Sequence, residues 1–314
     1  MGKLIWIASY PRSGNTWTRL FVNALVTLHA GDRVAPLARA DEWSRADPTR
    51  YFETWEISAP WYEDVLQKPV TDASFEEFSA ARVKVQRLIA ERARGPVFVK
   101  THHLNGVCDG RPVIDFSLTD RIVYLVRNPL DVAPSLADHF GMEIDAAVSM
   151  MNRPQFVMRA NENAASEVYG SWSENVTSWT AEARPYLHVV RYEDAAADPT
   201  QTFMRLGRFL GFRTSADDVA RAADAVAFEK AQRLEAQRVE TQGRQRAGTF
   251  FRQGRSGGWK EALSEKQVDR VVAAHGETMR RFGYADAAGA RERIAPYGET
   301  EAGRQLMQYA AQGA

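Results

Sequence analysis

The sequence has almost no cysteine: Cys108 is the only one among 314 residues. A single thiol excludes an intramolecular disulfide and any zinc site built from several cysteines. Because disulfides are typical of oxidising compartments, this composition favours a reducing one. We therefore expect a cytoplasmic protein.

Two further absences narrow the class of protein. No run of about 18 apolar residues occurs, and the first residues lack the regions of a secretion signal. The chain also lacks an excess of either charge, because 40 Lys and Arg balance 40 Asp and Glu. We therefore expect no membrane span and no nucleic-acid partner, and any anion site must be local.

What the chain does contain begins just after its N-terminus. Residues 4–9 (LIWIAS) are typical of a buried strand, and the apolar spacing over residues 16–28 predicts a helix. Between them, the stretch ASYPRSGNTW at 8–17 predicts a tight loop that ends at a helix N-terminus. Free amides, the flexible Gly14 and the charge of Arg12 suit a phosphate group, although an ordinary strand-to-helix turn would look similar.

This loop lacks the ending of the Walker pattern, GxxxxGK followed by Ser or Thr, whose lysine reaches the outer phosphates and whose hydroxyl holds magnesium. The absence argues against an ATP or GTP hydrolase. It favours a phosphate-bearing ligand that is handled without a metal. The six histidines show no HExxH or similar ligand spacing, so we expect no metal site.

The rest of the chain alternates predicted strands with predicted helices. Strands are expected at 97–100, 121–126 and 187–191, and helices at 75–94, from Pro129 onward, and at 171–183, 200–210, 217–238 and 264–281. This alternation predicts an α/β fold: a P-loop-like three-layer domain with a central, mostly parallel sheet flanked by helices.

Three segments depart from this alternation. Residues 31–72 are predicted to be rich in loops, and their aromatic side chains either line a pocket or pack the segment onto the domain. Residues 141–163 contain four of the eight methionines, which predicts a mobile, adaptable apolar surface or lid. Residues 238–258 carry several arginines among glycines, which fits either a solvated face or a loop that closes over an anion.

Four further blocks follow the opening stretch: VFVKTHHL at 97–104, YLVRNPLDVAPSLADHF at 124–140, VVRYEDAAADP at 189–199 and FFRQGRSGGWK at 250–260. With GSWSENVTSW at 170–179, they make the chain resemble the cytosolic-type sulfotransferases, in a bacterial-like variant. This family transfers a sulfuryl group from 3′-phosphoadenosine 5′-phosphosulfate (PAPS) to an acceptor hydroxyl or amine. The resemblance implies a sulfotransferase domain over 1–284, acceptor-site insertions near 31–72 and 141–170, and a C-terminal extension at 285–314.

The resemblance also implies a cofactor site. The opening stretch would hold the 5′-phosphosulfate, with Arg12 in place of the family's usual lysine and Trp17 stacked on the adenine. The residues implied to surround the phosphate of this loop are Arg12, Ser13, Gly14, Asn15 and Thr16. Those implied for the 3′-phosphate are Arg127, Ser135, Arg252, Gln253 and Gly254, and those near the adenine are Tyr192 and Phe228.

Catalytic roles follow from the block KTH. The resemblance makes His102 the base, and the chemistry requires one, because an alcohol loses its proton as it attacks sulfur. His103 is adjacent, and neighbours on a strand point to opposite faces, so only one of the two should meet the acceptor. Lys100 and Arg12 are the cations that would stabilise the departing phosphate oxygen.

The sequence departs from the commoner family pattern at Arg12, at Asn15, where threonine is usual, and at Gln253, where lysine is usual. The family's C-terminal dimerisation motif is not found, so the oligomeric state stays open. The acceptor class is a small molecule, a lipid or a glycosylated natural product. The alternatives are a P-loop-like phosphoryl-transfer enzyme, which would need magnesium and ATP, and a non-catalytic nucleotide-binding protein.

Overall fold

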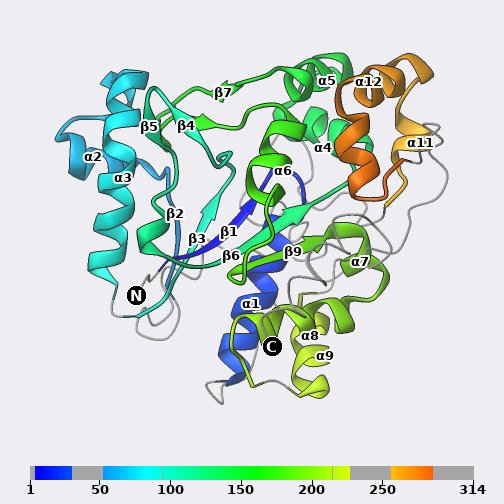
Figure 1. The fold of residues 1–314 in the computed structure, drawn as a ribbon, viewed down its shortest axis with the longest axis horizontal. Helices are drawn as coiled ribbons and strands as arrows, with labels where there is room; N and C mark the ends of the chain where they lie inside the picture. Colours follow the sequence, from blue (N-terminus) through cyan, green and yellow to red (C-terminus); the bar gives the residue numbers. More distant parts are fainter. Residues whose placement is uncertain (1–3, 30–51, 94, 214, 227–255, 286–314) are drawn as a thin grey trace, which may run out of the picture.

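The computed structural model describes residues 4–29, 52–93, 95–213, 215–226 and 256–285. Its centre is a five-stranded sheet in the order β2-β3-β1-β6-β9, and every neighbouring pair is parallel (Figure 1). The strands are β1 (Leu4–Ser9), β2 (Phe52–Trp55), β3 (Val97–Thr101), β6 (Thr119–Val126) and β9 (Leu187–Arg191). The expected parallel α/β sheet is confirmed.

β1 is buried along its whole length because helices cover both faces of the sheet. Its side chains alternate between two separate cores: Trp6 and Ala8 belong to one, and Ile5 and Ile7 to the other. The three-layer arrangement is therefore visible in the burial of a single strand.

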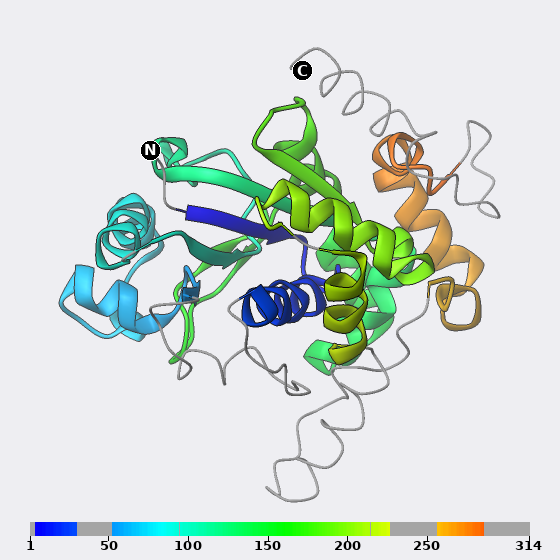
Figure 2. The same ribbon diagram turned by 90° about the horizontal axis from the view of Figure 1, so that it is seen from below.

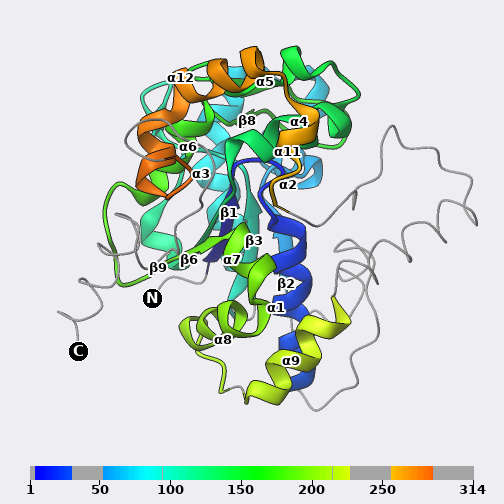
Figure 3. The same cartoon turned by 90° about the vertical axis from the view of Figure 1, so that its right-hand side faces the viewer.

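One face of the sheet is covered by α1 (Asn15–His29), α7 (Tyr192–Ala197), α8 (Pro199–Phe209) and α9 (Ala216–Ala225). Figure 3 shows α8 and α9 beside α1, away from α5 and α12. Phe21 of α1 stacks on Phe203 of α8, with 4.1 Å between the ring centroids. This layer supports the helix that begins at the loop of residues 10–14.

The other face is covered by α3 (Phe75–Arg92), α4 (Pro129–Phe140), α5 (Ile144–Asn152), α6 (Trp172–Thr180) and α12 (Glu265–Arg281). Here α2 (Ala59–Leu66) lies beside α3, near the β2 edge of the sheet (Figure 2). The short α11 (Trp259–Ala262) packs against α4. Smaller elements are β4 (Val107–Cys108), β5 (Arg111–Pro112), β7 (Val157–Met158), β8 (Glu167–Val168) and the 3₁₀ turns η2 (Val70–Asp72) and η3 (Phe116–Leu118).

Local sequence explains where several helices begin. Ser74, Ser171 and Ser264 each form a capping box, in which the serine and a Glu or Gln three residues later satisfy each other's amides. The side chain of Asn128 caps α4, and Pro129 occupies the first turn of this helix, where its missing N–H costs nothing.

Two expectations were wrong. Residues 52–72 are not a loop: they contain β2 and α2, and a four-residue strand is too short to show a period in the sequence. The methionine-rich segment is not simply an adaptable surface, because α5 forms there and buries Met150 and Met151 in the core. The predicted helix 217–238 begins as α9, and its part beyond residue 226 lies outside the described residues.

Among the described residues, no helix is both long and apolar enough to cross a membrane.

Candidate active site

A cavity of about 570 Å³ lies at the carboxyl ends of β1, β3 and β6. Ligands of open α/β sheets bind at this edge of the strands. Ten of the residues expected in the site line the cavity: Arg12, Gly14, Asn15, Thr16, Trp17, Lys100, His102, Arg127, Ser135 and Tyr192. The fold therefore brings together blocks that are far apart in the sequence.

The loop before α1 has an unusual backbone. Arg12 and Gly14 both have positive φ, at 68° and 97°. Glycine is needed at position 14 for a second reason: a Cβ there would lie 2.9 Å from the ring of Tyr192. The loop leads directly into α1, whose first amides have no intrahelical acceptor. These amides and the positive end of the helix dipole are suited to an anion.

Arg12, Arg127 and Ser135 connect this loop to the end of β6 and to α4. Arg12 Nε donates to Ser135 Oγ of α4 at 2.9 Å, and Arg127 Nη1 donates to the Arg12 carbonyl at 3.1 Å. The guanidinium of Arg127 lies 4.2 Å from the ring centroid of Tyr192. Arg127 Nε is buried without a hydrogen-bond partner among the described residues, so the side chain retains donor capacity.

Trp17 and Tyr192 form an aromatic wall on the same side of the cavity. Their ring centroids are 5.9 Å apart in an edge-on arrangement, and Phe203 supports Trp17 from behind at 5.2 Å. Such a wall offers apolar area to a flat ring at little entropic cost.

Two of the side chains expected to bind phosphate, those of Asn15 and Ser13, are buried. Asn15 is buried and donates to the Ile7 carbonyl and to Ser9 Oγ, at 2.9 and 3.2 Å, so its side chain ties the helix to β1. Ser13 is 1% exposed and is not part of the cavity lining. Ser13 Oγ has no hydrogen-bond partner among the described residues, and Asn15 lines the cavity, so the expectation that both contact a phosphate stays a prediction.

Four expected residues lie outside the described residues: Phe228, Arg252, Gln253 and Gly254. The described chain resumes just after them and is held against the cavity by Asp131 of α4. The carboxylate of Asp131 accepts from Gly257 N at 2.8 Å and from Trp259 N at 3.0 Å. Asp131 also lines the cavity.

His102 lies at the end of β3 with one ring nitrogen occupied. Its Nδ1 is 2.8 Å from the Ser9 carbonyl, so Nδ1 carries the proton and donates it. Nε2 is then the unprotonated atom. Burial, together with the charge of nearby Lys100, holds the pKa of His102 well below its usual 6.5. The ring is therefore neutral and able to accept a proton at pH 7.

Lys100 points into the same cavity from β3. Its Nζ lies 3.8 Å from the ring centroid of Trp55, a cation–π contact. Burial, with a contribution from the charge of Arg19, lowers the pKa of Lys100 to about 8. The amine is still mostly protonated at pH 7.

Two residues at the centre of the site could not be predicted from the sequence. Trp55 belongs to the unpredicted strand β2, and Glu167 lies on the two-residue strand β8. Glu167 is fully buried, which raises its pKa, and its Oε1 accepts from the His102 amide at 2.7 Å. Asp131, in contrast, could have been found, since it stands between Arg127 and Ser135 in the block RNPLDVAPS.

Within the described part of the chain, no three His, Cys, Asp or Glu residues gather as metal ligands would.

The cavity lies at the carboxyl ends of parallel strands beside a loop without a Walker lysine, and comparison with known proteins identifies the family of the chain. The sulfotransferase domain matches residues 3–283. The chain belongs to the sulfotransferase family, and it is a PAPS-dependent sulfotransferase, as the ordered motifs indicated.

Relatives support this assignment over most of the chain. It is 24% identical to sulfotransferase 2B1 of Rattus norvegicus, covering 95% of this chain and 77% of the relative. It is 23% identical to flavonol 4′-sulfotransferase of Flaveria chlorifolia, covering 85% and 76%. A retinol dehydratase solved with retinol and adenosine 3′,5′-bisphosphate (PAP) shares the fold, with a TM-score of 0.58, 21% identity and coverage of 89% and 82%.

Proposed function

We propose that this enzyme binds PAPS across the Arg12 loop and Arg127, and transfers the sulfuryl group in line to a hydroxyl or amine. The observation that carries the proposal is the convergence of Arg12, Arg127 and the neutral His102 on one cavity. The amides at the start of α1 suit the 5′-phosphosulfate, and the paired donors of Arg127 suit the 3′-phosphate.

The reaction requires a base for the acceptor and positive charge at the leaving group. His102 Nε2 accepts the acceptor's proton while the acceptor oxygen forms its bond to sulfur. The bond between sulfur and the bridging phosphate oxygen breaks, and PAP leaves with the electron pair. Lys100 and Arg12 stabilise the negative charge that develops on the leaving oxygen, and a fixed positive charge at this point makes a large contribution to catalysis.

The remaining cavity wall indicates the acceptor class. More of its residues are apolar or aromatic than polar, and the former include Trp55, Ile57, Phe140, Met158, Ala164, Ala165 and Tyr169. Its polar and charged residues are Asp131, His139, Arg159, Asn161, Glu167 and Glu261. This lining supports an amphipathic alcohol, such as a phenol, a lipid or a glycosylated natural product.

Calorimetry tests the cofactor assignment without an acceptor. We expect PAP to bind tightly in metal-free buffer, 5′-AMP to bind at least tenfold more weakly, and ATP with magnesium to show no advantage over 5′-AMP. Equal affinity for PAP and 5′-AMP would contradict the 3′-phosphate site. Preference for ATP with magnesium would favour the phosphoryl-transfer alternative.

The pH dependence of turnover tests the two titrating groups. Activity needs neutral His102, so the rate should fall only as pH drops through its lowered pKa, below 6.5. Activity also needs charged Lys100, so the rate should fall again as pH rises above about 8. The measurement is kcat/KM for PAPS, which reports the groups of the free enzyme, with an acceptor that does not titrate between pH 5 and 9. An acid limb centred above pH 6.5 would contradict this assignment of the base.

A further inference from the structure

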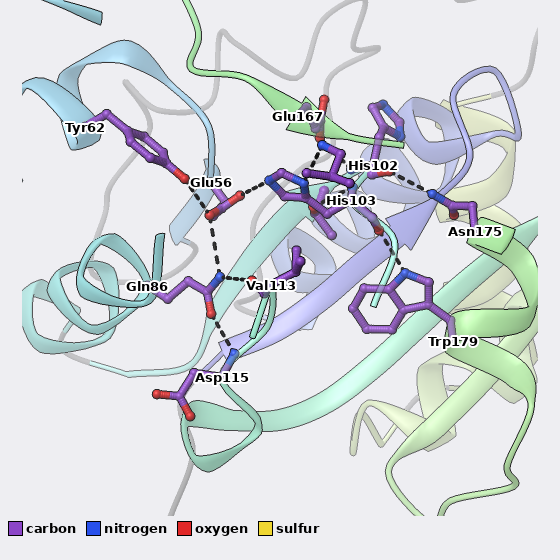
Figure 4. A network of polar contacts seen from close by, with 12 residues as sticks. Glu56, Tyr62, Gln86, His102, His103, Val113, Asp115, Glu167, Asn175 and Trp179 are labelled. Atoms are coloured by element: carbon purple, nitrogen blue, oxygen red, sulfur yellow. Dashed lines mark hydrogen bonds and ion pairs between the residues drawn. The ribbon is translucent and has the colours of Figure 1, made fainter. Parts of the chain in front are cut away.

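His103, the neighbour of the proposed base, is in close contact with other segments on every polar side. Its ring is fully buried, Nδ1 accepts from the Val168 amide at 2.8 Å, and Nε2 lies 3.1 Å from Glu56 Oε2. Its amide donates to Thr101 Oγ1, and its carbonyl accepts from Trp179 Nε1. Figure 4 shows this ring pointing to Glu56, away from His102.

These contacts fix the protonation of His103. An imidazole nitrogen that accepts an amide hydrogen carries no proton, so the Val168 contact leaves Nδ1 bare and places the proton on Nε2, facing Glu56. The contact with Glu56 is close, although its alignment is not that of a standard hydrogen bond. His103 is therefore neutral. It links β8 to the segment that follows β2, and it is not a second base.

Glu56 is itself held from several sides. It is fully buried, its Oε1 accepts from the Tyr62 hydroxyl at 3.1 Å, and its amide donates to the Lys100 carbonyl at 3.3 Å. Burial raises the pKa of Glu56, whereas the charge of the buried Arg82 and the hydrogen bond from Tyr62 lower it. The contacts with Tyr62 and the Lys100 carbonyl fix the residue in place.

These contacts of His103 lie one residue from His102, whose ring must be oriented toward the acceptor. The backbone of His102 is held by Glu167 at its amide and by Asn175 at its carbonyl, at 2.7 and 2.9 Å (Figure 4). The ring of His102 reaches Ser9 on β1 only if the end of β3 keeps its position. Both Glu167 and Val168 belong to β8, so the same short strand is hydrogen-bonded to His102 and to His103.

We propose that Glu56 and His103 are positioning residues, which clamp the end of β3 so that His102 donates Nδ1–H to Ser9 and presents bare Nε2 to the acceptor. The role of the clamp rests on the proposed function of His102 as the base. Because a displacement of about 1 Å can cost about a hundredfold in rate, such a clamp has a measurable effect on turnover.

Two variants of His103 separate its contact with Glu56 from its contact with Val168. His103→Gln is long enough to keep a donor facing Glu56, whereas His103→Asn reaches only toward Val168. Glu56→Asp withdraws the carboxylate by one methylene from the opposite side, and it replaces His103→Asn in the comparison if that variant does not fold. Thermal unfolding and PAP binding by calorimetry establish that each variant is folded.

The decisive readout is the tautomer of His102 in protein labelled with ¹⁵N-histidine, with its signals assigned by their loss in His102→Ala. We expect the Nδ1–H tautomer alone in the parent and in His103→Gln, and a mixture of tautomers in His103→Asn and Glu56→Asp. Turnover per PAP-binding site should be at least about tenfold lower in His103→Asn than in His103→Gln, with PAP affinity within twofold.

Identical His102 spectra in all four proteins would overturn the clamp. This result would leave the base assignment standing, because that assignment depends on the turnover of His102→Ala. Conversely, the spectra could differ as expected while His102→Ala keeps its turnover. The clamp would then position a residue that is not the base, so the proposed role of His102 would be wrong and the clamp would stand.

Discussion

Replacing His102 by alanine is expected to lower turnover at least about a hundredfold while leaving PAP affinity within about twofold. The base is lost, but no contact to either phosphate is, because Arg12, Arg127 and the amides of the loop remain. The measurement is kcat with saturating PAPS and the acceptor that gives the parent its highest rate in a screen of alcohols. PAP affinity is measured by calorimetry in parallel.

His102→Asn is the matched control for this experiment. Its side-chain amide can still donate toward the Ser9 carbonyl, which His102 Nδ1 contacts at 2.8 Å, but it cannot accept the acceptor's proton. We expect the asparagine variant to be nearly as slow as the alanine variant. An asparagine variant with near-parental turnover would mean that position 102 supports β1 and is not the base.

Replacing Arg127 by glutamine is expected to weaken PAP binding about thirtyfold and 5′-AMP binding less than threefold. A charge-assisted hydrogen bond contributes about 2 kcal/mol, which corresponds to about that factor in affinity. The difference between the two ligands isolates the 3′-phosphate, because 5′-AMP lacks only that group. Calorimetry without metal measures both constants.

Arg121→Gln provides the control at the other end of the same strand. Arg121 is paired with Asp120 near the start of β6, and it does not line the cavity. Its replacement should leave both affinities unchanged. If Arg127→Gln weakened 5′-AMP as much as PAP, Arg127 would act by holding the Arg12 carbonyl, which it contacts at 3.1 Å, and the 3′-phosphate assignment would be wrong.

The long, regular elements were predictable from the sequence because each combines a hydrophobic period with an end signal. The helix from Phe75 shows both, with Ser74 as its cap and a clear apolar face. β2 escaped prediction because four residues carry no period, and its pairing with β3 depends on contacts distant in the sequence. The same limit explains why β8, and with it Glu167, could not be found.

The candidate site was predicted where its residues stand in ordered blocks and missed where a side chain acts through tertiary contacts. Arg127 and Ser135 were identified from RNPLDVAPS, and both line the cavity. Asn15 was expected at the phosphate and lines the cavity, but only the folded chain reveals that its side-chain NH₂ donates to Ile7 and Ser9. The partner of His103, Glu56, is 47 residues away in the sequence, so no local pattern could point to it.

Because β1 lies at the centre of the sheet, the residues of the site come from two sides, that of β3 and that of β6. β6 and the helix after it bring Arg127 and Ser135, whereas β3 and the segments beyond it bring His102, Trp55 and Glu167. Most of the proposed acceptor wall, including Trp55 and Ile57, therefore lies on the β3 side of this central strand, whereas Phe140 of α4 lies on the other side with Arg127 and Ser135. If the proposed roles hold, substitutions on the β3 side would change the choice of acceptor while leaving the proposed 3′-phosphate contacts of Arg127 and Ser135 in place.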